Sequence, residues 1–167
     1  MRATRLSATD RPTLRKAQIG RCGELLVQYR LLKHGIESAS MTTDAGIDLV
    51  AYAPRSREAV TVQVKANLQL KPAGGRGKML LSWDLRETSP AQMVALVDLS
   101  TERVWLFRDE EFDKVAQQNK GGNRKFFIYT DPEARPKEGR LSMDSDFEGH
   151  LIEARIEELL GSAACPA

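Results

Sequence analysis

Cysteine and histidine are scarce in this chain of 167 residues, which contains two of each. Cys22 and Cys165 do not show the short spacing of a zinc site, and one pair is too few for a disulfide framework. We therefore expect a protein of the reducing cytoplasm. The sequence also lacks any apolar run close to the roughly 20 residues of a membrane-spanning helix, so no membrane partner is expected.

Neither sign of charge is in large excess. The formal net charge is +2, which does not by itself predict binding to nucleic acid. The charges are unevenly distributed, however, because residues 1–21 carry six bases and one acid, whereas residues 131–161 carry nine acids and four bases. This asymmetry predicts an electrostatic field that draws a polyanion towards the N-terminal part of the chain.

The length and the composition predict one globular domain. Hydrophobic residues make up 41% of the chain and charged residues 29%, which are ordinary values for a globular protein. A chain of this length can also bury a substantial core. We divide it into a flexible basic arm (1–12), an α/β domain (13–130) and a last segment (131–167) that completes the same domain with irregular chain and an acidic helix.

The periodicity of the apolar residues predicts an α/β fold. Apolar residues recur every three to four positions over 13–34 and predict a long helix, with Leu25, Tyr29 and Leu32 on its apolar side. Strands are expected at 36–42, 46–53, 59–66, 79–83, 93–99, 103–107 and 126–129. Further helices are expected at 109–118 and 146–160. This order predicts a mixed central sheet that is flanked by helices.

The strand at 59–66 has a clean alternation of residue types. Val60, Val62 and Val64 point to one face, so that Gln63 and Lys65 share the other. A turn expected at 53–57 allows an antiparallel hairpin between this strand and the one before it. That hairpin would place Asp48 beside Gln63 and Lys65.

Asp48 and Glu24 are candidate metal ligands. Asp48 lies in an apolar strand-like run, where a buried carboxylate needs a partner. Together with Glu24 and the backbone carbonyl of Val64, it offers the hard oxygen ligands that Mg²⁺ prefers. A metal held in this way polarises a phosphate and lowers the pKa of a bound water, and Lys65 could position that water or offset developing negative charge. Taken singly, Glu24 and Lys65 are also compatible with solvated surface positions.

The ordered set of Glu24 on a helix, Asp48 in Gly-Ile-Asp-Leu-Val, and Gln63 and Lys65 in Val-Gln-Val-Lys resembles the PD-(D/E)xK nuclease superfamily. This superfamily includes Holliday-junction resolvases, restriction enzymes and intron homing endonucleases. The resemblance covers about residues 13–67, and the strands at 93–107 fit the remaining core. It implies a restriction-endonuclease-like core with the order αβββ-α-β, DNA as substrate, and Mg²⁺ or Mn²⁺ as cofactor.

The resemblance also implies roles for single residues. Asp48 matches the first acid, Lys65 the motif lysine, and Glu24 the additional acid of the first helix. Gln63 stands where the family usually has its second acid. An amide oxygen can still coordinate a cation, but it brings no negative charge, so Gln63 is a possible metal ligand in a Gln-x-Lys variant of the motif.

Several further residues could contact nucleic acid. Arg21 and Gln28 share a helix stripe with Glu24, and Arg21 could contact a phosphate or pair with Glu24. Two basic glycine-rich loops, at 71–78 and 119–125, could either follow a phosphate backbone or simply be solvated. The candidates in the first loop are Lys71, Arg76 and Lys78. Trp83 and Trp105 could stack on bases, although Trp105 lies in an apolar strand typical of a core.

A second function remains compatible with the sequence. Because Gln63 replaces an acid and the net charge is small, the chain could be a non-catalytic module that binds nucleic acid or a protein on the same fold. A homodimer is also possible, with the apolar side of the helix at 146–160 as its interface. Activity with a divalent metal distinguishes the enzyme from the binding module.

Overall fold

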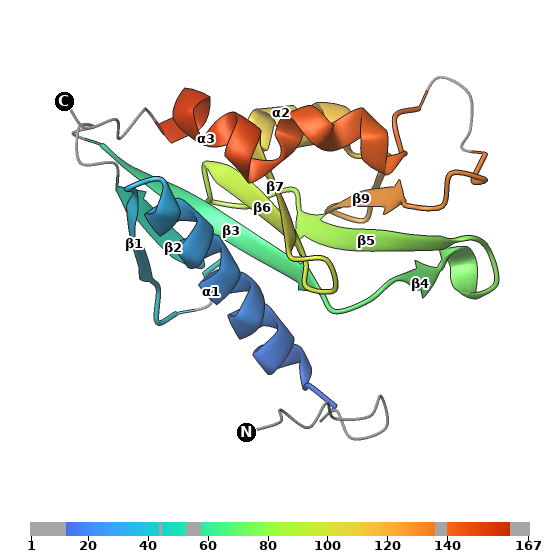
Figure 1. The fold of residues 1–167 in the computed structure, drawn as a ribbon, viewed down its shortest axis with the longest axis horizontal. Coiled ribbons are helices and arrows are strands. Elements are labelled where there is room, and N and C mark those ends of the chain that lie inside the picture. The colour runs from blue at the N-terminus through green and yellow to red at the C-terminus, as the bar shows by residue number, and fades with distance from the viewer. Residues whose placement is uncertain (1–12, 44, 53–57, 136–139, 161–167) are drawn as a thin grey trace, which may run out of the picture.

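The computed structural model describes residues 13–43, 45–52, 58–135 and 140–160. The predicted arm at 1–12 and the predicted turn at 53–57 lie outside these ranges. Within them the chain forms a five-stranded sheet and a four-stranded sheet, with helices packed against them (Figure 1). No helix of the described part is long and apolar enough to cross a membrane.

The five-stranded sheet is mixed and has the strand order β1-β2-β3-β6-β7. Only the central pair, β3 and β6, is parallel, and the neighbouring pairs are antiparallel. The predicted hairpin of β2 and β3 and the predicted α/β class with a mixed sheet are confirmed. The strands of this sheet are Glu37–Ser40 (β1), Leu49–Tyr52 (β2), Ala59–Asn67 (β3), Met93–Asp98 (β6) and Arg103–Arg108 (β7).

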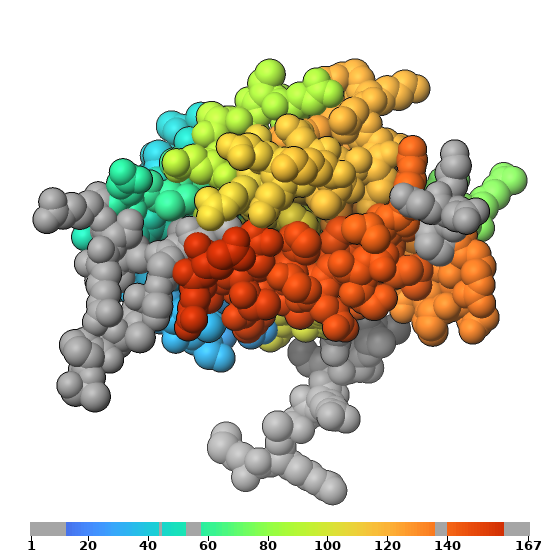
Figure 2. All heavy atoms as spheres, turned by 90° about the horizontal axis from the view of Figure 1, so that it is seen from above, coloured from blue at the N-terminus to red at the C-terminus, as the bar shows by residue number. Residues whose placement is uncertain are grey.

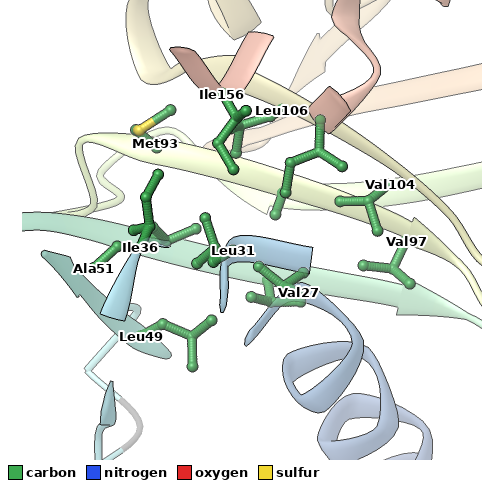
Figure 3. Packing of buried hydrophobic residues seen from close by; sticks show 14 residues of the cluster. Val27, Leu31, Ile36, Leu49, Ala51, Met93, Val97, Val104, Leu106 and Ile156 are labelled. Atoms are coloured by element: carbon green, nitrogen blue, oxygen red, sulfur yellow. The ribbon is translucent and has the colours of Figure 1, made fainter. Parts of the chain in front are cut away.

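Helix α1 (Lys16–Lys33) covers one face of this sheet, and Val27 and Leu31 enter the core that Figure 3 shows. The predicted apolar side of the helix was wrong. Leu25, Tyr29 and Leu32 are 50%, 57% and 58% exposed. The buried side instead begins at Gly23, where a Cβ would lie 2.6 Å from the Cβ of Ala66 in β3. A glycine carries no apolar signal, so periodicity assigned the wrong side.

The second sheet has the order β4-β5-β9-β8 and is antiparallel throughout. Its strands are Lys71–Pro72 (β4), Met79–Arg86 (β5), Gln118–Lys120 (β8) and Asn123–Tyr129 (β9). Two expectations were wrong here. The segment 119–125 is a hairpin rather than a loop, and β4 and β5 follow β3 where the order αβββ-α-β places a helix.

Both tryptophans belong to a second core between the two sheets. Trp83 is 2% exposed and Trp105 is 1% exposed, and their rings meet edge to face at 5.8 Å. Phe107 and Phe126 pack in the same cluster, with ring centroids 5.5 Å apart. Neither tryptophan can therefore stack on a base, because each ring is already covered by aromatic neighbours.

The C-terminal segment packs on β7. A 3-10 helix (Asp144–His150) precedes α3 (Ile152–Leu160), where one continuous helix was expected. Ile152 and Ile156 are fully buried in the core that also contains Val27 and Leu31, so they cannot form the predicted dimer interface.

Figure 2 shows α3 lying beside α2 (Asp109–Val115), which ends earlier than the predicted residue 118. Arg155 in α3 donates to both carboxylate oxygens of Glu111 in α2 at 2.8 Å. Burial opposes ionisation of Glu111, but these bonds outweigh it and lower the pKa of its carboxyl. The ion pair therefore fastens the C-terminal helix to the rest of the domain.

The close approach at Gly23 predicts opposite effects at two glycines of α1. We expect Gly23→Ala to destabilise the protein by about 1–3 kcal/mol, because the added methyl group meets the short Ala66 side chain. Gly20→Ala is the matched control and should stabilise by about 0.5–1 kcal/mol, since nothing lies within 4 Å of its Cβ. Urea unfolding measures both changes, and equal midpoints for the two variants would contradict the packing.

Candidate active site

The candidate site lies at the N-terminal end of β2, where β3 continues beyond its partner strand. The pairing of these strands spans Ala59–Val62 of β3, whereas β3 runs on to Asn67. Asp48 directly precedes β2, rather than lying within the strand as predicted. Its N–H donates to the carbonyl of Val62 at 3.0 Å, and its own carbonyl accepts from the N–H of Met41 at 2.9 Å. Backbone bonds on both sides therefore fix Asp48 at the edge of β3.

The carboxylate of Asp48 takes the place of a partner strand for Val64. The N–H of Val64 donates to Oδ2 of Asp48 at 2.6 Å. In a strand, the N–H and the C=O of one residue point to the same side. The Val64 carbonyl is therefore directed towards the edge at which Asp48 lies. A carboxylate and a backbone carbonyl are thus placed at the same edge of β3.

A groove with a volume of about 1080 Å³ opens at this edge. Four of the predicted catalytic or metal-binding residues line it, namely Glu24 from α1, Asp48, and Val64 and Lys65 from β3. The first turns of α1 and parts of β4 and β5 complete its walls. In Figure 1, the N-terminal half of α1 and strand β4 lie on opposite sides of the end of β3.

Glu24 is held by an ion pair within α1. Arg21 Nη1 donates to Glu24 Oε2 at 2.7 Å and to Ser40 Oγ at 2.8 Å. Gln28 continues the network, because its amide oxygen accepts from Ser40 Oγ at 3.2 Å. Arg21 therefore pairs with Glu24, which is one of the two roles predicted for it, and neither Arg21 nor Gln28 is among the residues that line the groove.

Gln63 is buried beside the groove rather than exposed in it. It is 7% exposed, and it is not among the lining residues. Its Oε1 accepts a hydrogen bond from Ser89 Oγ at 3.2 Å. Ser89 lies in the segment between β5 and β6, and no motif in the sequence pointed to it, because the contact depends on how that segment packs against β3.

The structure also separates the residues predicted to contact nucleic acid. Lys71 lines the groove, whereas Arg76 and Lys78 do not. Lys78 forms an ion pair with Asp131 at 2.8 Å. Two charged lining residues were missed by the sequence interpretation, Lys16 at the start of α1 and Asp84 in β5. Asp84 lay beyond the predicted strand end at 83, so its face could not be assigned.

The lining residues fit a divalent cation with oxygen ligands. No group of three or more His, Cys, Asp or Glu side chains that could hold a metal occurs among the described residues. A metal would therefore depend on Asp48, Glu24, the Val64 carbonyl and water. Mg²⁺ is commonly held by one or two carboxylates with several waters. A carboxylate has about four lone-pair sites, so the bond from Val64 leaves Asp48 able to bind a cation.

The bond from Val64 predicts that two substitutions of Asp48 differ in stability. Asp48→Asn keeps an oxygen acceptor for the Val64 N–H, and we expect it to change the free energy of unfolding by less than about 1 kcal/mol. Asp48→Ala leaves a buried donor unsatisfied and should cost about 1–3 kcal/mol. Urea unfolding of both variants checks the difference, and equal stabilities would show that water satisfies this N–H.

Among solved structures, the chain is similar to that of a bacterial homing endonuclease, I-Ssp6803I. The match covers 89% of this chain and 93% of that chain, with a TM-score of 0.58 and 18% sequence identity. No protein-family model matches the chain, and no curated protein is significantly similar to it. At this identity the likeness shows a shared fold, which is the nuclease-like fold that the sequence resemblance implied.

Proposed function

We propose that this protein is a metal-dependent endonuclease that hydrolyses phosphodiester bonds in DNA. The observation that carries the proposal is that Glu24, Asp48, Val64 and Lys65 line one groove and that Asp48 accepts a hydrogen bond from the Val64 N–H. Glu24, Asp48 and Lys65 follow the chain order of the nuclease resemblance, in which Gln63 replaces the usual second acid. The similarity to a homing-endonuclease structure supports the same fold for the chain.

Each residue has a distinct proposed role. Asp48, Glu24 and the Val64 carbonyl would hold Mg²⁺ or Mn²⁺, which when bound polarises the scissile phosphate and acidifies a water. Lys65 lines the same groove and carries a positive charge. It would orient the attacking water or stabilise the negative charge that develops on the phosphate oxygens. The hydrogen bond from Val64 would hold the Asp48 carboxylate in the position from which it binds the metal.

Gln63 would act as a positioning residue in a Gln-x-Lys variant of the nuclease motif. Its side chain is buried, and Ser89 holds the amide oxygen by a hydrogen bond. A neutral amide in this place leaves the metal to the two carboxylates, since it adds no charge of its own. We therefore expect weaker metal binding than in a site with three acids.

Cleavage of supercoiled, linear and branched DNA with Mg²⁺ or Mn²⁺ tests the proposal. We expect Asp48→Asn and Lys65→Met each to lower the rate by about 100-fold or more, because each removes a group that acts on the reacting phosphate or water. Titration with Mn²⁺ separates their roles. Asp48→Asn should weaken metal binding, whereas Lys65→Met should retain it.

The matched control is Lys114→Gln, which removes an exposed lysine from α2 outside the groove. This variant should cleave and bind Mn²⁺ as the unaltered protein does. Cleavage that persists in both Asp48→Asn and Lys65→Met would contradict the assigned roles. Absence of cleavage on every substrate would reject the enzymatic function.

Gln63→Glu tests the place of Gln63 beside the metal site. If its side chain faces the metal, an added negative charge should tighten Mn²⁺ binding by about tenfold. Ser89 can donate to a carboxylate as it does to the amide, so its hydrogen bond is retained. Calorimetric titration measures the change, and an unchanged affinity in a folded variant would place Gln63 outside the metal site.

A non-catalytic module that binds DNA or a protein is the second candidate. Two observations favour it, since Gln63 replaces an acid and Glu24 is already paired with Arg21. DNA binding that is salt-sensitive and independent of metal, without cleavage, would support this function. Absence of both cleavage and DNA binding would point to a protein partner.

A further inference from the structure

We propose that duplex DNA binds to the solvent face of the sheet β4-β5-β9-β8, with the β8–β9 hairpin inserted in its major groove. This inference rests on the proposed function and deepens it, because it assigns the surface that presents the substrate to the groove. The sequence had already indicated Lys71 and the segment 119–125 as candidates for phosphate contacts, whereas Asp84 and Arg86 in β5 were not indicated.

The strand register divides this sheet into two faces. Residues that are paired across an antiparallel ladder lie on the same face. One face buries Leu85 and Phe126 in the second core. The opposite face therefore carries Asp84 with its partner Lys125, and Arg86 with Asn123. Lys120 is the partner of Asn123 on the other side, so it belongs to this solvent face as well.

The solvent face is basic, and its cations are not neutralised within the protein. Lys71, Arg86, Lys120 and Lys125 lie on it, against the single acid Asp84. In the described part of the chain, none of these four cations forms an ion pair. Two cations that neighbour the face do form such pairs, since Lys78 binds Asp131 and Arg124 binds two carboxylates. Unpaired cations spaced along a sheet suit a phosphate backbone.

The face is continuous with the groove. Lys71, Ser82 and Asp84 belong to the solvent face by their register, and all three also line the groove that contains Asp48 and Lys65. A strand of DNA that crosses the sheet would therefore reach the candidate metal ligands without leaving the protein surface. This continuity identifies the sheet as the substrate platform rather than as a solvated face alone.

The β8–β9 hairpin is a two-stranded ribbon that ends in a tight turn. Gly121 and Gly122 both have positive φ, of 62° and 74°, which suits a tight two-residue turn. Asn119, Lys120 and Asn123 flank this turn and are exposed. A two-stranded ribbon fits the major groove of duplex DNA, and amide and ammonium groups can bond to base edges there. Single-stranded DNA offers no such groove.

The test uses the full chain with Asp48→Asn, so that binding is measured without cleavage. Anisotropy of a labelled duplex in EDTA gives the affinity and its salt dependence. We expect the added pair Lys120→Gln and Lys125→Gln to weaken binding by about tenfold or more in 0.1 M salt. The slope of log K against log salt should become shallower by about 0.9 for each phosphate that the protein no longer neutralises.

The matched control is the pair Lys33→Gln and Lys114→Gln, which removes the same charge from α1 and α2. Affinity should fall much less in this control, and a single strand should bind more weakly than the duplex. The proposal is overturned if both pairs weaken binding equally, if the single strand binds as well as the duplex, or if the duplex does not bind. If the duplex binds through this sheet face but the unaltered protein cleaves no DNA, the proposed enzymatic function is rejected. The assignment of the DNA-binding surface then still holds.

Discussion

The hydrogen bond from the Val64 N–H to the Asp48 carboxylate is the constraint on which the site depends. Because β2 stops pairing at Val62, the edge of β3 beyond it exposes backbone groups that need partners. The Asp48 carboxylate satisfies one of these groups, the Val64 N–H. The carbonyl of the same residue points to the same side of the strand, towards the groove. The carboxylate and the carbonyl of the proposed metal site thus lie at one edge because β3 extends beyond β2.

Much of this arrangement could be predicted because it is local. The alternation in β3 and the hairpin with β2 follow from contiguous residues, and so does the proximity of Asp48 to Lys65. Interactions between distant segments were not predictable. Ser89 reaches Gln63 only through packing, and the buried side of α1 depends on Gly23 meeting Ala66. Neither interaction leaves a periodic or compositional signal.

In the second sheet, the sequence favoured loops where the structure has strands. Glycine and lysine at 71–78 and 119–125 favoured loops, yet the chain forms β4 and the β8–β9 hairpin there. Glycine at 121–122 serves the turn itself, while the flanking polar residues pair as strands. Exposed strands with polar side chains lack the apolar alternation by which strands are recognised.

The placement of the site within a contiguous segment has a consequence for folding. Glu24, Asp48, Val64 and Lys65 all lie in α1 to β3, which close over short loops, whereas β5 joins β9 across a much longer stretch of chain. Pairings between nearby residues cost less chain entropy and form sooner. The segment from α1 to β3, which carries the candidate site, can therefore order first, and the pairing of β5 with β9 follows.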